Sequence, residues 1–306
     1  MRPAWSVLFF TTLAGAGQGL FLALVAGDFV LGLPTRWLLA GAGASLALTF
    51  AGLVSSTFHL GHPERGWRAA ARWRTSWLSR EVIVLPAFLA SVFFWALALW
   101  LGWPDRLVTA LAVLGVLLAI VLYVCTAMIY ACLPFLQEWR TPLTVCNYTA
   151  LGLTTGTYAA ALLAAIWHPP MATWYATGAL VVGTLAYLGR LASLARNARL
   201  RPKSTLATAI GVKHPKIVQI AQGSMGGSFN TREFFHGRPR EVVRAYRLAL
   251  LWLLQPVPAL LLLVGGASAA VLVAALLLHY AGVLAERWYF FAEARHPQNI
   301  YYQAIA

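Results

Sequence analysis

The chain has 306 residues, of which 60% are hydrophobic and only 10% are charged, and its formal net charge is +14. Soluble globular chains carry about 25% charged residues, so this composition excludes an ordinary soluble domain. The apolar residues form long continuous stretches, and a helix of about 20 such residues crosses the hydrocarbon of a bilayer. We therefore predict an all-α integral membrane protein.

Eight apolar stretches follow one another along the chain, and we expect them to form a single membrane domain over residues 1–306. The predicted spans are residues 5–31, 36–58, 81–101, 106–131, 144–167, 171–194, 244–264 and 267–290. The first stretch is too long for the apolar part of a cleavable signal peptide, so we expect it to remain as a helix. The connections alternate in character, because short and almost uncharged ones are followed by long basic ones at 59–80, 132–143 and 195–243.

The basic residues lie almost entirely on one side of the predicted spans. Of the 23 lysines and arginines, only Arg36 and Arg106 fall on the side of the short connections, and the remaining 21 fall on the other. Cytoplasmic flanks of membrane helices carry the excess of lysine and arginine. The bias therefore predicts that both termini and the long loops are cytoplasmic. An acidic partner on that side could add to the bias without reversing it.

The first long loop is a polar and aromatic segment, H-L-G-H-P-E-R-G-W-R-A-A-A-R-W-R-T-S-W-L-S-R-E, between two apolar walls. His59 closes the second span, and Glu81 opens the third after Ser79, a reasonable N-cap. Tryptophans settle at headgroup depth, and arginines face anionic lipid or a partner. A surface anchor of this kind explains the arginines, among them Arg65, Arg68 and Arg72. It does not explain His59, and only the helix dipole would account for Glu81.

Two further polar residues are candidates for a ligand role. Gln18 lies between Gly15 and Gly19, whose spacing predicts close helix packing. An amide at this depth needs a partner, from another helix or from a ligand. Tyr130 lies near the cytoplasmic end of its span, where it is either an aromatic-belt residue or a ligand contact.

The loop at 195–243 has a basic half followed by G-S-M-G-G-S-F-N-T-R-E-F-F-H-G-R-P-R. Its glycines and aromatic residues suggest an ordered loop, and exposed aromatics on a basic loop are typical of a protein-docking surface. We expect this surface to include Phe229, Arg232, Phe234 and Phe235. Contact with lipid headgroups is the plainer alternative. The ending E-R-W-Y-F-F-A-E-A-R-H is interpreted as structural.

Most kinds of chemistry find no support in the sequence. It has no phosphate loop, dinucleotide fingerprint or zinc spacing. Its three cysteines form no CxxC and are too few for an iron–sulfur cluster. A haem would have to use His59 and His279 at mismatched depths, and a transporter would need ionisable groups at mid-membrane, where only His279 is expected. Nucleic-acid binding is excluded because the arginines flank membrane spans.

A quinone site fits the remaining residues. Quinone reduction takes two electrons and two protons, and histidine exchanges protons near its ordinary pKa of about 6.5. A neighbouring carboxylate can relay protons to water. His59 and Glu81 lie at the same end of consecutive spans, within reach of an apolar quinone in the bilayer. The electrons must come from a separate subunit, since the chain shows no redox centre and no metal site of its own.

Several segments resemble one family. H-L-G-x-P followed by R-x-W-R and L-S-x-E, the loop S-F-N-T-R-E-F-F-H-G and the ending E-R-W-Y-F-F-A-E-A-R-H are similar to the membrane anchor subunit of dimethyl sulfoxide reductase-type molybdoenzymes. The resemblance covers essentially the whole chain. It implies an anchor, non-catalytic alone, that holds a molybdopterin catalytic subunit and an iron–sulfur subunit at the membrane and exchanges electrons with ubiquinone or menaquinone.

The resemblance also implies that the quinone-site residues are His59 and Glu81. A complex on the cytoplasmic side of a bacterial inner membrane is similar to the sulfite-oxidising molybdoenzymes, which send electrons into the quinone pool. The alternative is a respiratory reductase in which quinol reduces dimethyl sulfoxide or a similar acceptor.

Overall fold

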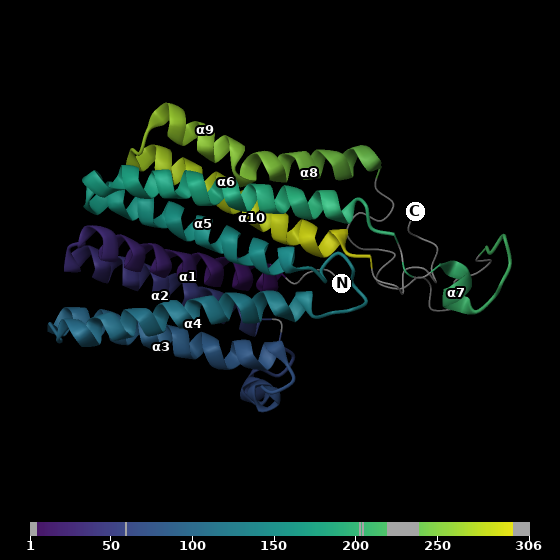
Figure 1. The fold of residues 1–306 in the computed structure, drawn as a ribbon, viewed down its shortest axis with the longest axis horizontal. Helices are drawn as coiled ribbons and strands as arrows, with labels where there is room; N and C mark the ends of the chain where they lie inside the picture. Colours follow the sequence, from purple (N-terminus) through teal and green to yellow (C-terminus); the bar gives the residue numbers. More distant parts are fainter. Residues whose placement is uncertain (1–4, 59, 202, 204, 219–238, 296–306) are drawn as a thin grey trace.

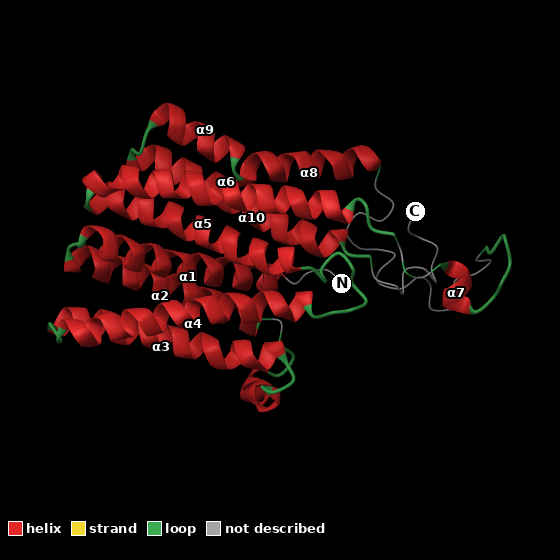
Figure 2. Cartoon of the chain, in the orientation of Figure 1, coloured by secondary structure: helices red, strands yellow, loops and turns green. Residues whose placement is uncertain are grey.

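The structure is a computed structural model that describes residues 5–58, 60–201, 203, 205–218 and 239–295. Within these residues all regular structure is helical and no strand occurs (Figure 2). Eight helical segments are long and apolar enough to cross a membrane. The predicted all-α membrane fold with eight spans is therefore confirmed.

The helices run side by side along the long axis of the molecule (Figure 1). In chain order they are α1 (Trp5–Leu31), α2 (Thr35–Thr57), η1 (Pro63–Arg72), α3 (Trp77–Leu101), α4 (Asp105–Ala131), α5 (Pro142–Trp167), η2 (Pro169–Met171), α6 (Ala172–Asn197), α7 (Leu206–Ile210), α8 (Arg240–Leu254), α9 (Pro256–Gly265) and α10 (Ala269–Glu293). The 3₁₀ helix η1 projects from the bundle next to the start of α3, and the short α7 lies outside it.

The centre of the bundle is a close contact between α1 and α5. Gly15 and Gly19 of α1 face Gly152 and Gly156 of α5, and a Cβ atom on Gly156 would overlap the backbone of α1. Small residues allow this approach, which dispersion rather than the hydrophobic effect stabilises in lipid. The hydroxyl of Tyr123 on α4 donates to the carbonyl of Gly15 at 2.7 Å. The predicted packing role of the two glycines of α1 is confirmed.

The third span starts earlier than predicted. The side chain of Ser76, not that of Ser79, caps α3, since the Ser76 hydroxyl accepts the backbone N–H of Ser79 at 3.3 Å. The prediction of Ser79 as N-cap was wrong because polar residues before the apolar run are also compatible with a helical turn. Glu81 is consequently the fifth residue of the helix. The dipole effect fades within the first turn, so it does not account for an acid at this position.

The seventh span is broken in the middle, where a continuous helix over 244–264 was predicted. Gln255 has non-helical dihedral angles, and Pro256 starts α9. Pro258 has no N–H to donate to the carbonyl of Leu254, four residues earlier. Nδ1 of His279 on α10 takes that place and donates to the Leu254 carbonyl at 2.6 Å. A break in lipid is tolerated when a neighbouring helix satisfies the freed backbone in this way.

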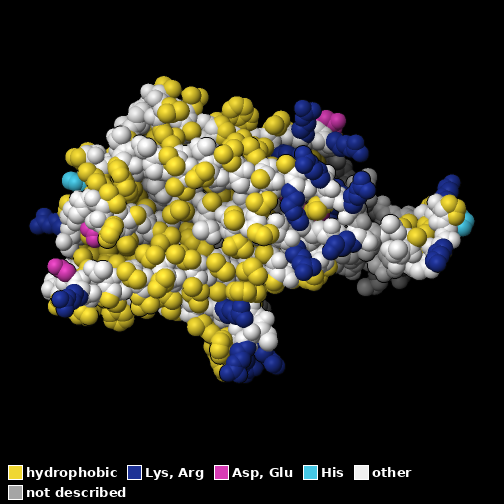
Figure 3. All heavy atoms as spheres, viewed as in Figure 1, with side chains coloured by type: hydrophobic (Ala, Val, Ile, Leu, Met, Phe, Trp, Pro, Cys, Tyr) yellow, Lys and Arg dark blue, Asp and Glu magenta, His cyan; other side chains and the backbone are white. Residues whose placement is uncertain are grey.

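The two ends of the bundle differ in charge. The start of α1, the end of α10, η1 and the start of α8 lie at one end, and dark-blue lysine and arginine side chains gather there (Figure 3). The opposite end has Arg36 at the start of α2 and Arg106 at the start of α4. The separation of charge that the sequence predicts is therefore a property of the folded molecule.

Candidate functional site

A buried carboxylate lies near the charged end of the bundle. Glu81 points into the bundle from α3 and is only 3% exposed. The hydroxyl of Thr126 on α4 donates a hydrogen bond to its Oε1. An ionisable group buried in a membrane-spanning segment is costly and usually functional. The packing of α3 against α4 positions this acid and its partner, so the pair is a built feature of the bundle.

Gln18 supplies a second buried polar group, on α1. The side chain is 2% exposed, and its Nε2 donates to the carbonyl of Ala14 one turn earlier at 3.0 Å. Its Oε1 has no hydrogen-bond partner among the described residues. A buried amide oxygen without a partner costs free energy unless a ligand or water satisfies it. The described helices thus satisfy the amide donor of Gln18 but not its acceptor, and a ligand role for this residue stays a prediction.

Tyr130 lies in an aromatic cluster at the charged end of the bundle. Its ring stacks on Tyr148 at 5.6 Å between centroids and meets Trp139, Phe290 and Phe291 edge-on. These contacts join α4 to α5 and α10. The ring contacts of Tyr130 therefore support a role in helix packing.

The predicted docking residues are only partly described. Arg65, Arg68 and Arg72 lie on η1 and are exposed to solvent. The guanidinium of Arg68 lies 5.6 Å from the ring centroid of Trp67, whose side chain is 73% exposed. His59 and the loop residues Phe229, Arg232, Phe234 and Phe235 lie outside the described residues. The exposed part of this surface is therefore basic and aromatic, as the sequence predicts for η1.

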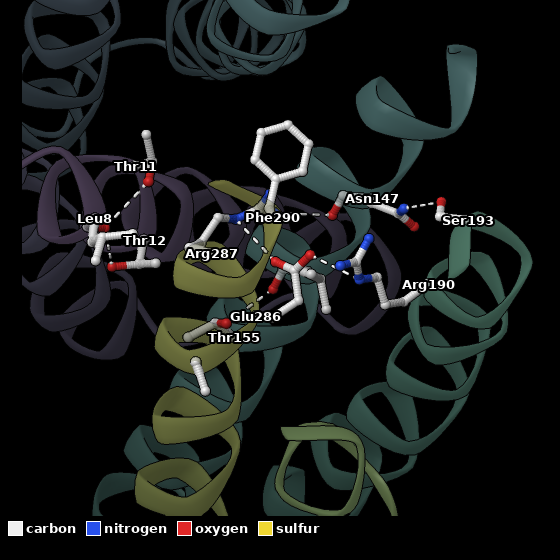
Figure 4. Close-up of polar contacts among 12 residues, drawn as sticks. Leu8, Thr11, Thr12, Asn147, Thr155, Arg190, Ser193, Glu286, Arg287 and Phe290 are labelled. Atoms are coloured by element: carbon white, nitrogen blue, oxygen red, sulfur yellow. Dashed lines mark hydrogen bonds and ion pairs between the residues drawn. The ribbon is translucent and has the colours of Figure 1, made fainter. Parts of the chain in front are cut away.

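A buried ionic cluster, which the sequence analysis did not anticipate, joins α6 and α10 (Figure 4). Glu286 lies between two arginines: its Oε1 is 3.0 Å from Nε of Arg190, and its Oε2 is 3.5 Å from Nε of Arg287. All three side chains are at most 3% exposed. Glu293 adds a second carboxylate at 3.4 Å from Nη2 of Arg190.

The sequence analysis interprets the ending that contains Glu286 as structural. The ion pairs agree with this interpretation, because they connect α10 to α6. The available signal was an arginine inside the sixth span, at a depth where an unpaired charge is costly.

A small cavity of about 10 Å³ lies beside this ionic cluster. Oδ1 of Asn147 and Nη1 of Arg287 are buried there without a hydrogen-bond partner among the described residues. Such a volume is about that of one water molecule, and its polar walls suit one. Arg287 also stacks on the ring of Tyr148, with 3.5 Å from its Cζ to the centroid. The cluster thus holds α5, α6 and α10 together by polar contacts.

His279 is fully buried at the break of the seventh span, and both of its ring nitrogens are engaged. Nδ1 donates to the Leu254 carbonyl, and Nε2 lies 3.1 Å from the hydroxyl of Thr155. An axial haem ligand needs a free ring nitrogen. The arrangement therefore does not suit the His59 and His279 haem pair. Among the described residues, no group of three or more histidine, cysteine, aspartate or glutamate side chains could hold a metal ion.

The fold and the site define a multi-pass membrane protein with one charged end and a buried acid close to it. The chain belongs to the family described as DMSO reductase anchor subunit (DmsC), which matches residues 1–293. It is also similar to a sulfite dehydrogenase subunit of Allochromatium vinosum, with 49% identity over 325 aligned positions that cover 100% of both chains. No solved structure matches it significantly. The protein is thus a membrane anchor subunit, as the resemblance implies.

Proposed function

We propose that this anchor passes electrons between an iron–sulfur subunit and a quinone, at a site formed by Glu81 and His59 with Gln18. The carboxyl group of Glu81 carries the proposal, because it is buried in the membrane part of the bundle and hydrogen-bonded by Thr126. The pairing of His59 with Glu81 is the expectation from the sequence. Tyr130 would contribute indirectly, by holding α4 in place through the aromatic cluster.

The proposed reaction is the oxidation of sulfite by quinone. Sulfite and water give sulfate, two protons and two electrons, and the quinone takes up two electrons and two protons to form quinol. The molybdopterin and iron–sulfur subunits would supply the first half. This chain would serve the second half: Glu81 exchanges a proton with a quinone oxygen, while the Thr126 hydroxyl holds the carboxyl group in place.

Two observations support the direction and the sidedness. The similar protein from Allochromatium vinosum bears the name of a sulfite dehydrogenase. Nearly all lysines and arginines of the sequence fall on the side of the long loops, and many of the described ones gather at one end of the bundle (Figure 3). This bias favours the cytoplasmic side of the bacterial inner membrane for that end and for the partner subunits. The family description names a reductase anchor, so a quinol-oxidising anchor of a dimethyl sulfoxide-type reductase is the second candidate.

The same end of the bundle offers a docking surface for the iron–sulfur subunit. Arg65, Arg68 and Arg72 project from η1 next to the start of α3, the helix that carries Glu81. Docking there would bring the electron donor to the quinone site. The loop residues Phe229, Arg232, Phe234 and Phe235 would extend the surface, as the sequence suggests.

The test is electron transfer in the purified complex with sulfite as donor, measured separately with a soluble quinone analogue and with an artificial dye. We expect Glu81→Gln and His59→Ala to lose quinone reduction and to keep dye-linked sulfite oxidation. Glu241→Gln is a matched control, because Glu241 is also a glutamate in an early turn of a membrane helix but is exposed. It should behave as wild type in both assays.

Normal quinone kinetics in both site variants would refute the proposed site. A wild-type complex that oxidises no sulfite, but oxidises quinol with dimethyl sulfoxide as acceptor, would favour the second candidate.

A further inference from the structure

The 3₁₀ helix η1 (Pro63–Arg72) lies on the flank of the bundle, beside the start of α3, and its axis runs across the direction of the spans (Figure 1). The spans cross the membrane, so a helix that runs across them near the charged end lies along the membrane surface. None of the side chains of η1 is buried. Beyond its contact with α3, η1 is therefore open to the headgroup layer of the bilayer.

The exposed side chains of η1 form two edges of different chemistry. Side chains repeat every three residues in a 3₁₀ helix, so η1 has three edges, and the one that contains Gly66 is half-buried. A second edge carries Trp67 and continues to Trp73, which follows the last helical residue with helical dihedral angles. The third carries Arg68 and continues to Arg74 in the turn that follows. The two tryptophans are 73% and 51% exposed, so η1 presents an aromatic edge next to a basic one.

The same pair of side chains occurs twice on these edges. The guanidinium carbon of Arg68 lies 5.6 Å from the ring centroid of Trp67, and that of Arg74 lies 5.2 Å from the ring centroid of Trp73. A separation of six residues equals two turns, so the pairs face the same way about 12 Å apart. Tryptophan rings settle at headgroup depth, and arginine extends its charge from an apolar stem towards water and phosphate. Each pair therefore combines the two groups that an anionic headgroup layer accommodates.

Arg80 of α3 fixes the orientation of this segment. Its Nε donates to the carbonyl of Trp73 at 2.9 Å, and its Nη2 donates to the carbonyl of Arg74 at 2.9 Å. Its guanidinium group also stacks on the ring of Trp77, 4.2 Å from the centroid. Carbonyl groups at the end of a helix lack helical partners, and Arg80 satisfies two that follow η1. The aromatic and basic edges are therefore held in a fixed orientation relative to the spans.

We propose that η1 binds the anionic surface of the membrane that holds the anchor, with its tryptophan edge in the headgroup layer and Arg68 and Arg74 on lipid phosphates. Residues 63–80 contain five arginines and one glutamate, so their charge is complementary to anionic phospholipid. A cytoplasmic partner would cover the charged end of the bundle, whereas η1 lies on the flank, where lipid surrounds the spans. The iron–sulfur subunit can still reach the arginines, since the tryptophans lie on a different edge.

The test measures which phospholipid lies beside η1 in the complete complex, reconstituted in nanodiscs at low salt. The exposed Cys132 and Cys146 are first replaced by serine. A fluorophore is then attached at Ala71→Cys, an exposed position between Arg68 and Arg74 on the basic edge. Brominated phosphatidylglycerol should quench this fluorophore at a mole fraction about fivefold to 30-fold lower than brominated phosphatidylcholine does, since each arginine near an anionic surface favours an anionic lipid by about fivefold. High salt should reduce the difference.

Arg68→Gln combined with Arg74→Gln should abolish the difference between the two lipids, and the corresponding pair of lysine substitutions should keep it. A fluorophore at Trp167→Cys, where α5 ends at the opposite end of the bundle, is the control and should be quenched equally by both lipids. Equal quenching at Ala71→Cys with both arginines present would overturn the proposal. Protection from both lipids would overturn it as well and assign η1 to a protein partner. Neither sulfite oxidation nor quinone reduction is measured, so the outcome does not depend on the proposed quinone site.

Discussion

Removing Glu286 should destabilise the protein more than removing either of its partners. The carboxylate pairs with Arg190 at 3.0 Å and with Arg287 at 3.5 Å, and all three groups are buried. Glu286→Gln leaves the buried Arg287 without a carboxylate partner and leaves Arg190 with Glu293 alone, at 3.4 Å. Arg190→Gln removes the pair at 3.0 Å but leaves Glu286 paired with Arg287, and the carboxylate that it leaves without a partner is Glu293, whose side chain is 14% exposed. The structure therefore predicts an order of effects as well as their sign.

The magnitude follows from buried ion pairs of this kind. Removing one partner costs about 3–5 kcal/mol, because an uncompensated charge remains in a poorly solvated site. For a chain of this size, each 1 kcal/mol lowers Tm by about 2–4 °C, so Glu286→Gln should lower it by roughly 10 °C. Arg190→Gln should lower it less. The measurement is thermal unfolding in detergent followed by circular dichroism, with the exposed Glu241→Gln as control, which should stay within about 0.5 kcal/mol of wild type.

A double variant separates pairing from local disruption. Glu286→Gln combined with Arg190→Gln should cost less than the two single changes added together, because the pair is removed as a unit. If Arg190→Gln proved the more damaging single change, or if the double variant were strictly additive, the ionic cluster would not hold the helices as the distances suggest.

Three further predictions concern helix packing, the broken span and the buried acid. Gly156→Leu should lower the free energy of unfolding by about 3 kcal/mol or more, because a side chain there overlaps the backbone of α1. Gly43→Leu is the control and should leave the free energy of unfolding unchanged, because a side chain there meets open space. Equal Tm values for the two variants would contradict this prediction. His279→Leu should lower the free energy of unfolding by about 1–3 kcal/mol and speed hydrogen exchange at the α8–α9 junction, because the carbonyl of Leu254 loses its hydrogen-bond donor. Unchanged exchange would mean that His279 does not stabilise this junction. Thr126→Val should lower quinone-dependent turnover while preserving dye-linked oxidation and Tm, and normal turnover would show that its hydrogen bond does not position the acid.

The residues near Glu81 show how far sequence reasoning reaches. The acid and its position after a polar segment were predictable, because the boundary between polar and apolar residues is a local property of the chain. Its burial and its hydrogen bond to Thr126 were not, because they depend on how α3 is rotated against α4. Gln18 shows the same limit. The sequence marks it as polar at depth, but only the packing of α1 leaves its Oε1 without a partner among the described residues.

The eight spans, the segregation of basic residues to one side and the close approach at Gly15 and Gly19 could all be predicted from the sequence. These follow from composition, length and spacing along single helices. The packing of the helices was needed to show that Glu286 of α10 pairs with Arg190 of α6, and that His279 donates to the free carbonyl at the break of the seventh span. In each case the partners are far apart in sequence, and only the rotation and register of neighbouring helices bring them within contact distance.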